Sequence, residues 1–148
     1  MIKKPYSVLV VDDEEDICLL LQEHLEEKYG EKVVVKTSTQ ANKALELIEN
    51  DYVNIVITDM HMPDVEGDQI LRKAVTMQRG IQVIIITGMD DYATAFTSFL
   101  DGAVGFLRKP FGFSDFVMAV DPCIERLDNW SNLLKPPAKR QQKTDPLK

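Results

Sequence analysis

The fold is set by the stretch VLVVDDEED at residues 8–16, in which a short apolar run stops at a row of acids. The run is rich in β-branched residues and shows no polar alternation, as is typical of a strand covered on both faces in a parallel sheet. Apolar residues then recur at helical spacing over residues 16–28, at Ile17, Leu20, Leu21 and Leu25. The stretch therefore predicts a strand, a charged turn and an amphipathic helix.

The same unit recurs along the whole chain. The strand-like runs are residues 8–11, 33–35, 53–58, 83–86 and 104–107. The helix-spaced segments are residues 16–28, 40–49, 67–77, 91–100 and those from 114 onward. We expect the apolar residues of these segments, including Ala95, Phe96 and Phe99, to cover the sheet. Because crossovers are right-handed, the alternation predicts a flavodoxin-like (βα)5 α/β fold, a doubly wound parallel five-stranded sheet in the order 2-1-3-4-5.

Pro122 interrupts the last helical segment. A proline inside a helix cannot donate to the carbonyl of Met118 and crowds that turn. Two alternatives stay open. The helix is kinked near Pro122, or it breaks there and Asp121 caps a new helix that runs through Trp130 to Leu134.

Reactive side chains follow four of the five strands, and ligands of open α/β sheets bind beyond the carboxyl ends of the strands. These residues are Asp12 and Asp13 after the first strand, Asp59 after the third, Thr87 after the fourth, and Lys109 with Pro110 after the fifth. The order 2-1-3-4-5 makes these ends neighbours. Capping of the first helix would account for one acidic pair but not for the other three ends. We therefore expect three carboxylates, a hydroxyl and an ammonium around one pocket.

Such a carboxylate cluster favours a bound cation, because like charges within about 4–6 Å raise one another's pKa. Oxygen donors without Cys or His point to a hard ion, Mg²⁺ with Mn²⁺ as the alternative. A metal beside an aspartate also suits phosphoryl transfer, because it neutralises charge on the phosphoryl oxygens. Asp59 is then a candidate nucleophile, and Thr87 and Lys109 are candidate ligands of the phosphoryl oxygens.

Five motifs in this order resemble the receiver domain of response regulators in two-component signal transduction, the CheY-like superfamily. They are VLVVDDEED at 8–16, IVITDMHMP at 55–63, GD at 67–68, IIITG at 84–88 and FLRKPF at 106–111. Each motif alone is weak, but their order on the predicted strands is specific. The resemblance covers about residues 5–128.

The resemblance implies roles for the residues at the strand ends. Asp59 would be the phosphoacceptor, and Lys109 would contact the phosphoryl group. Asp12 and Asp13 would hold Mg²⁺ together with Asp59 and the backbone carbonyl of His61. The protein would be phosphorylated by a histidine kinase or a phosphotransfer protein and would act as a cytoplasmic signalling switch.

A conformational switch is also implied. Thr87 and Phe106 would be the switch pair, in which Thr87 moves toward the phosphoryl group and Phe106 turns from exposed to buried. The face formed by the fourth helix, the fifth strand and the fifth helix would then change its affinity for an output protein. The Lys109–Pro110 peptide bond would be cis. His61 and Met89 are candidate modulators of dephosphorylation.

The expected output is binding rather than turnover, so the chain is not expected to be an enzyme beyond its own phosphorylation and dephosphorylation. It is either a stand-alone regulator or the receiver of a longer regulator or hybrid kinase, and a homodimer is a further option. Two other classes stay open. One is an Mg²⁺-dependent phosphatase of the haloacid-dehalogenase type, which carries a second aspartate where His61 stands here. The other is a receiver-like binding module that is not phosphorylated.

Composition and charge exclude several classes. With 148 residues, 45% of them hydrophobic, the chain is long enough for one globular domain and is neither collagen-like nor disordered. No apolar run approaches the roughly 18–20 residues of a membrane span. We expect no signal peptide, because the apolar residues 8–11 run straight into the acids. Residues 133–148 carry a net charge of +4, which leaves −11 on residues 1–132. Because this part of the chain repels phosphate groups, it should bind nucleic acid poorly. We expect a receiver domain over residues 1–128 and a helix extension with a basic, flexible tail over residues 129–148, with no DNA-binding domain and no membrane contact.

Overall fold

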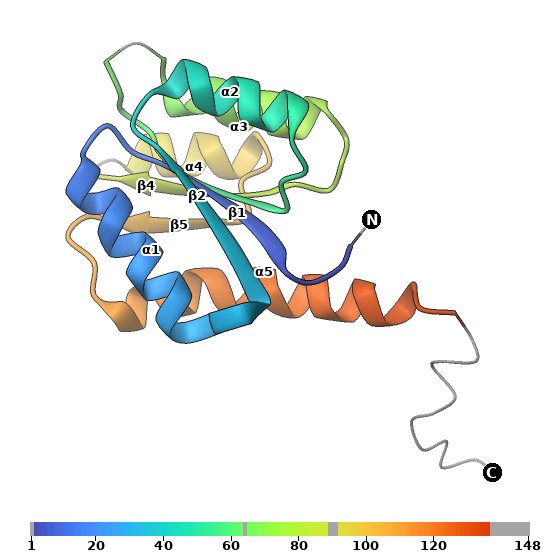
Figure 1. The fold of residues 1–148 in the computed structure, drawn as a ribbon. Helices are drawn as coiled ribbons and strands as arrows, with labels where there is room; N and C mark the ends of the chain where they lie inside the picture. The colour runs from blue at the N-terminus through green and yellow to red at the C-terminus, as the bar shows by residue number, and fades with distance from the viewer. Residues whose placement is uncertain (1, 64, 89–91, 137–148) are drawn as a thin grey trace.

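The computed structural model describes residues 2–63, 65–88 and 92–136. Strands and helices alternate along the chain (Figure 1). In order they are β1 (Tyr6–Val11), α1 (Glu15–Tyr29), the short 3₁₀ helix η1 (Gly30–Lys32), β2 (Val33–Ser38), α2 (Ala41–Asn50), β3 (Ile55–Asp59), α3 (Gly67–Thr76), β4 (Gln82–Thr87), α4 (Tyr92–Leu100), β5 (Gly105–Arg108) and α5 (Phe113–Leu133). Within these residues, no helix is both long enough and apolar enough to cross a bilayer.

The five strands form one parallel sheet in the order β2-β1-β3-β4-β5. This confirms the predicted flavodoxin-like fold and its strand order. In register, Val11 lies beside Ser38 and Thr58, and Asp59 lies beside Ile86. The carboxyl ends of β1, β3 and β4 therefore lie next to one another at one edge of the sheet.

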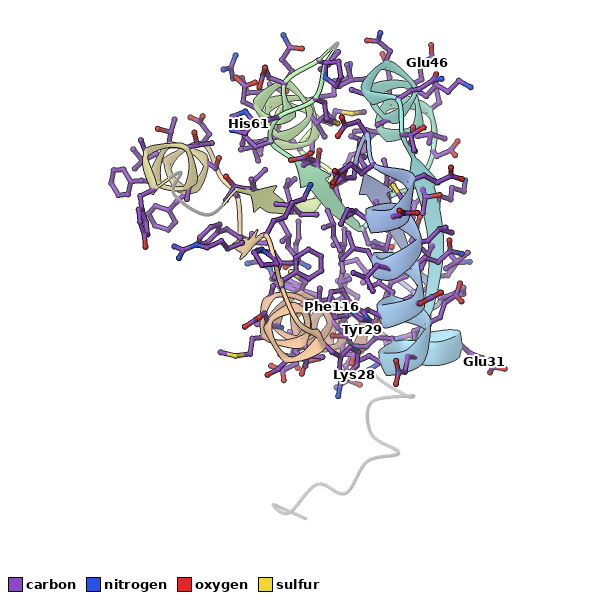
Figure 2. The ribbon with its side chains drawn as sticks, turned by 90° about the vertical axis from the view of Figure 1, so that its left-hand side faces the viewer. Lys28, Tyr29, Glu31, Glu46, His61 and Phe116 are labelled. Carbon is purple, nitrogen blue, oxygen red and sulfur yellow. The ribbon has the colours of Figure 1, made fainter. Side chains whose placement is uncertain are left out.

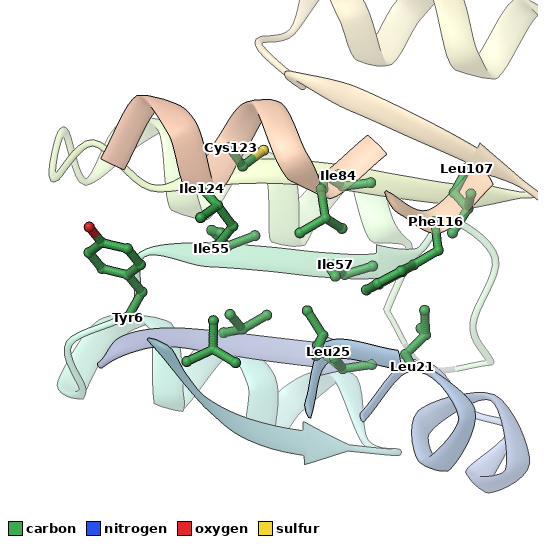
Figure 3. Close-up of a cluster of buried hydrophobic side chains, with 14 of the residues drawn as sticks. Tyr6, Leu21, Leu25, Ile55, Ile57, Ile84, Leu107, Phe116, Cys123 and Ile124 are labelled. Atoms are coloured by element: carbon green, nitrogen blue, oxygen red, sulfur yellow. The ribbon is translucent and has the colours of Figure 1, made fainter. Parts of the chain in front are cut away.

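Two hydrophobic clusters cover the two faces of the sheet. Successive residues of a strand point to opposite faces, so Val8 and Val10 enter one cluster whereas Leu9 and Val11 enter the other. The first cluster joins the sheet to α1 and α5 (Figure 3), and the second joins it to α2 and α3. Strands β1, β3 and β4 are buried on both faces, which explains their uninterrupted apolar runs.

The two edge strands do not follow this rule. In β2 only Val33 and Ser38 are buried, and in β5 only Leu107 is buried. The prediction that each strand is covered on both faces is therefore wrong for β2 and β5, because each has a neighbouring strand on one side only and most of its residues stay partly or fully exposed.

Helix α4 differs most from its prediction. Phe96 and Phe99 are 63% and 68% exposed, so they do not cover the sheet as expected. Ser98 is the buried residue of α4, and Ala95 is partly buried beside it. The helix lies over β4 near the short edge strand β5, where small side chains fit against the sheet and the large ones are left facing outward.

Helix α5 runs without a break from Phe113 to Leu133, with Pro122 inside it. The alternative in which Asp121 caps a separate helix is therefore wrong. Hydrogen bonds on both sides of Pro122 attach this part of α5 to the rest of the domain: Tyr29 donates to Asp121 at 2.6 Å, and Gln82 donates to the Cys123 carbonyl at 3.0 Å. Figure 1 shows the C-terminal part of α5 extending past the body of the domain.

Candidate functional site

Three carboxylates meet at the carboxyl ends of β1 and β3. One oxygen from each of Asp12, Asp13 and Asp59 lies within 4.8 Å of the others, and we call these residues the acidic cluster. Asp12 and Asp59 are buried, whereas Asp13 is exposed. Burial raises the pKa of Asp12 and of Asp59, because a charged carboxylate loses solvation there. The cluster predicted from the strand ends is therefore present as a group of side chains.

The backbone orients both buried carboxylates in the same way. The Glu14 N–H donates to Asp12 Oδ1 at 2.9 Å, and the His61 N–H donates to Asp59 Oδ1 at 3.3 Å. In each case the donor is two residues after the aspartate, as in an Asx-turn. Asp12 Oδ2 is buried and has no hydrogen-bond partner among the described residues.

The loop after β3 depends on Gly67, the first residue of α3. A Cβ atom there would lie 2.3 Å from the Asp59 carbonyl oxygen and 2.7 Å from the Met60 Cα. The Gly67 N–H also donates to the Met60 carbonyl at 2.8 Å. The glycine of the GD motif thus lets α3 begin directly against the end of the strand that carries Asp59.

Lys109 brings the positive charge to the acidic cluster. Its Nζ lies 3.0 Å from Asp12 Oδ2 and 3.4 Å from Asp59 Oδ2. Burial lowers the pKa of Lys109, but the surrounding carboxylates outweigh burial and raise it overall. The Lys109–Pro110 peptide bond is cis. Lys109 therefore stays charged and faces the cluster from the loop after β5.

Glu14 is a fourth carboxylate of the site, which the sequence analysis did not single out. Its Oε2 accepts a hydrogen bond from Lys109 Nζ at 3.4 Å. Because five acidic residues follow one another in DDEED, the sequence does not show which side chains face the end of the sheet. Glu14 could therefore not be predicted. Asp12 and Asp13 were found because they directly follow the strand.

Thr87 and Phe106 lie on the neighbouring strands β4 and β5. Thr87 is buried at the end of β4, and its Oγ1 has no hydrogen-bond partner within the described part of the chain. Its carbonyl accepts from the Lys109 N–H at 2.8 Å. Phe106 is 41% exposed, and the Arg108 guanidinium lies over its ring at 5.9 Å and over the Tyr92 ring at 4.7 Å.

His61 takes part through its backbone rather than its ring. The ring is largely exposed, and Nδ1 lies 3.5 Å from Glu66 Oε2, at the start of α3 (Figure 2). It is the His61 N–H that contacts the acidic cluster, through Asp59. Met89, the other candidate modulator of dephosphorylation, lies outside the described residues.

The donor atoms fit a hard divalent cation. Each side-chain donor of the acidic cluster is a carboxylate oxygen, the ligand that Mg²⁺ and Mn²⁺ prefer. Asp12 Oδ2 is also buried without a hydrogen-bond partner among the described residues, and the Lys109 ammonium at 3.0 Å compensates for its lost solvation. The residues of the acidic cluster therefore fit such an ion.

Comparisons with known proteins agree on one family. A family model described as the response regulator receiver domain matches residues 8–121. The C4-dicarboxylate transport transcriptional regulatory protein DctD of Rhizobium meliloti is 31% identical over 113 residues, which cover 76% of this chain and 24% of that protein. Response regulator SaeR of Staphylococcus epidermidis is 32% identical over 130 residues, which cover 86% of this chain and 55% of that protein.

Among solved structures, a response regulator receiver domain protein from Clostridium thermocellum superposes with a TM-score of 0.74 at 32% identity. That match covers 84% of this chain and 98% of the other chain. The curated relatives are longer, since this chain spans about half of SaeR and about a quarter of DctD.

Proposed function

Because the chain belongs to the response regulator receiver domain family, we propose that it is a phosphoacceptor switch phosphorylated on Asp59. The observation that carries the proposal is the convergence of Asp12, Asp13 and Asp59 within 4.8 Å, with Lys109 Nζ 3.4 Å from Asp59. Histidine kinases or phosphotransfer proteins would be the phosphodonors.

Asp59 is the group that reacts. One of its carboxylate oxygens attacks the phosphorus, the bond between phosphorus and the donor nitrogen breaks, and the leaving imidazole takes up a proton. Asp12, Asp13, Asp59 and the His61 carbonyl would hold Mg²⁺, which when bound neutralises charge on the carboxylates and on the phosphoryl oxygens. Lys109 pairs with a phosphoryl oxygen, since its ammonium already lies beside Asp59.

Thr87 and Phe106 transmit the change. The buried Thr87 hydroxyl, unpartnered among the described residues, is free to donate to a phosphoryl oxygen. Phe106 borders a hollow of about 370 Å³ lined by Ala95, Ser98, Phe99, Ala103, Val104 and Gly105. Both features support the switch pair: one supplies a donor that the phosphoryl group can attract, and the other supplies space beside the ring.

The proposed output surface is the aromatic face, which we define as Tyr92, Phe96, Phe99 and Phe106, all exposed on α4 and β5. Contiguous exposed apolar side chains of this kind mark interaction sites. Arg108 connects the α4 and β5 parts of this face through its contacts with Tyr92 and Phe106. An output protein or a second copy of the chain would bind here together with α5.

We assign residues 1–128 to the receiver and residues 129–148 to an extension. The longer relatives suggest that such a receiver can regulate further domains, so the chain is either a stand-alone regulator or part of a longer one. The catalytic role is limited to its own phosphoryl transfer and dephosphorylation.

Incubation with Mg²⁺ and acetyl phosphate, followed by intact-mass measurement, tests the proposal. Wild type should gain one phosphoryl group, and Asp59→Asn should gain none. Asp51→Asn is the matched control, because Asp51 is a surface carboxylate that pairs with Lys36 at 2.7 Å. This variant should be phosphorylated like wild type.

Two results would contradict the proposal. Repeated release of phosphate from many substrates would indicate a phosphatase of the haloacid-dehalogenase type. A wild-type chain that neither gains a phosphoryl group nor releases phosphate would indicate a binding module that is not phosphorylated.

A further inference from the structure

Glu14 is the carboxylate of the site for which the proposed function gives no role. Lys109 forms hydrogen bonds of 3.4 Å with Asp59 Oδ2 and with Glu14 Oε2. Asp12 Oδ2 is nearer, at 3.0 Å, and forms an ion pair with the ammonium. The ammonium therefore contacts Asp12, Asp59 and Glu14.

Hydrogen bonds fix the backbone of Glu14, and its side chain is directed to Lys109. Its N–H donates to Asp12 at 2.9 Å, and its carbonyl accepts from Ile17 and Cys18 at 3.1 and 3.2 Å in the first turn of α1. Glu14 precedes α1, yet its side chain forms no capping hydrogen bond to the helix. The side chain instead reaches the loop after β5, 95 residues away in the sequence.

Under the proposed function, the other carboxylates near Lys109 bind the metal or the phosphoryl group. Asp12 serves the metal, and Asp59 serves both the metal and the phosphoryl group. Of the three described carboxylates that contact Lys109, Glu14 is the one that stays available to it throughout phosphorylation. We propose that Glu14 is a positioning residue that holds the Lys109 ammonium within reach of the phosphoryl group on Asp59; this inference rests on the proposed function.

Glu15 provides a matched control. It is the next residue, lies in the first turn of α1 and carries the same charge, but among the described residues no hydrogen bond or ion pair joins it to Lys109. Removing either charge lowers the repulsion of an anionic phosphodonor to a similar extent. A loss of beryllofluoride affinity that is seen only in the Glu14 variants would therefore come from the lost contact with Lys109.

The test compares wild type with Glu14→Gln, Glu14→Ala, Glu15→Gln and Glu15→Ala. The probe is beryllofluoride in the presence of Mg²⁺, with its dissociation constant measured by NMR titration. The ε-methylene signal of Lys109, identified by its loss in Lys109→Ala, reports the lysine directly. Phosphorylation by acetyl phosphate is followed in parallel.

We expect Glu14→Ala to weaken beryllofluoride binding about two- to fivefold, the range for a partly exposed ion pair. Glu14→Gln should lose less affinity for beryllofluoride, because its amide oxygen can still accept a hydrogen bond from the Lys109 ammonium. Both should shift the Lys109 signal, whereas the Glu15 variants should leave it in place and bind beryllofluoride at least as well as wild type.

Equal behaviour of the Glu14 and Glu15 variants in both measurements would overturn this inference while leaving the proposed function intact. A wild-type chain that neither binds beryllofluoride nor gains a phosphoryl group would overturn both. Thermal unfolding of the four variants checks that each is folded, since these side chains are exposed and should shift Tm by no more than about 3 °C.

Discussion

At the scale of single residues, the site concentrates negative charge where the fold can least solvate it. Asp12 is fully buried and Asp59 is 6% exposed, yet both lie in one acidic cluster. Lys109 offsets only part of this charge. The free energy of unfolding should therefore be limited by the same groups that we propose to carry the function, a common conflict between stability and activity.

Asp59→Asn should raise the stability of the metal-free protein. The raised pKa values of Asp12 and Asp59 mean that folding favours their protonated forms. Their contribution is therefore present below the usual aspartate pKa of about 3.9 and is lost as pH rises through the raised values. In EDTA at pH 7.5 we expect Asp59→Asn to gain on the order of 1 kcal/mol in urea unfolding.

The pH dependence and a surface control make this result specific. The advantage of Asp59→Asn should shrink as pH is lowered toward 4, where the wild-type carboxylates take up protons. Glu46→Gln removes one charge from the exposed side of α2 and should change little (Figure 2). A metal-free Asp59→Asn variant less stable than wild type at pH 7.5 would contradict the expectation.

Gly67→Ala should disturb the site through its backbone. The added Cβ would lie 2.3 Å from the Asp59 carbonyl oxygen, so either α3 or the end of β3 must shift. We expect a loss of about 2–4 kcal/mol in denaturant unfolding together with slower phosphorylation. Gly105→Ala is the control, because its Cβ would make ordinary contacts of 3.6 Å. Unchanged stability of Gly67→Ala would show that the loop after β3 adapts freely.

At the scale of elements, α4 is the helix that contributes least to the core. Ser98 is its buried residue, whereas Ile70, Leu71 and Ala74 of α3 are buried in the second cluster. Few buried apolar contacts mean a low free energy of local opening. A helix held so weakly can change position at little cost, which suits the surface through which we propose that the switch is read.

Phe96→Ser with Phe99→Ser should leave the fold intact but change what the protein binds. Both side chains are mostly exposed, so we expect a loss below about 1 kcal/mol in thermal or urea unfolding. Leu71→Ala, which removes a fully buried side chain from α3, should cost about 2–5 kcal/mol. If the double variant unfolds as readily as Leu71→Ala, the aromatic face belongs to the core rather than to an interface.

The alternation of strands and helices explains how much the sequence could predict. The runs at β1, β3 and β4 are apolar on both faces, so strand order and the meeting of Asp12 with Asp59 followed from pattern and topology. The orientation of α4 did not follow, because aromatic residues at helical spacing look the same whether they face a sheet or a partner. Glu14 was missed for a similar reason, since its role depends on a side-chain direction within an acidic run.

At the scale of the whole molecule, one carboxylate joins the two ends of the described chain. Asp128 on α5 accepts from Tyr6 at 2.6 Å and from Lys32 at 2.5 Å. Lys4 lies 3.9 Å away. These residues, which we call the Asp128 group, lie near the amino end of β1, at the opposite end of the strand from the acidic cluster. The group attaches the C-terminal half of α5 to the start of β1 and to η1.

Asp128→Asn should destabilise the fold near neutral pH. Although burial opposes ionisation, the Lys32 and Tyr6 contacts lower the pKa of Asp128 overall, so its contribution is present above the usual aspartate pKa and is lost as pH falls through the lowered value. We expect a loss of about 1–2 kcal/mol at pH 7 in urea unfolding, and this difference should be lost as pH falls from the usual aspartate pKa of about 3.9 through the lowered value. Asp51→Asn, which removes one carboxylate from an isolated surface ion pair, should lose less free energy of unfolding at pH 7. A pH-independent cost for Asp128→Asn would mean that packing rather than charge holds α5 in place.

Arg108 and Lys109 are adjacent in the chain, yet one contacts the rings of Tyr92 and Phe106 and the other contacts the acidic cluster. A single peptide unit therefore separates the proposed phosphorylation site from the proposed output surface, so the proposed switch needs no long chain of contacts through the core. Thermodynamic reciprocity then runs in both directions along that unit. If Asp59 is phosphorylated as we propose, a molecule that binds Arg108 in place of its two rings would change the free energy of the phosphorylated state. The binding partner would then help to set the fraction of the protein that carries the phosphoryl group.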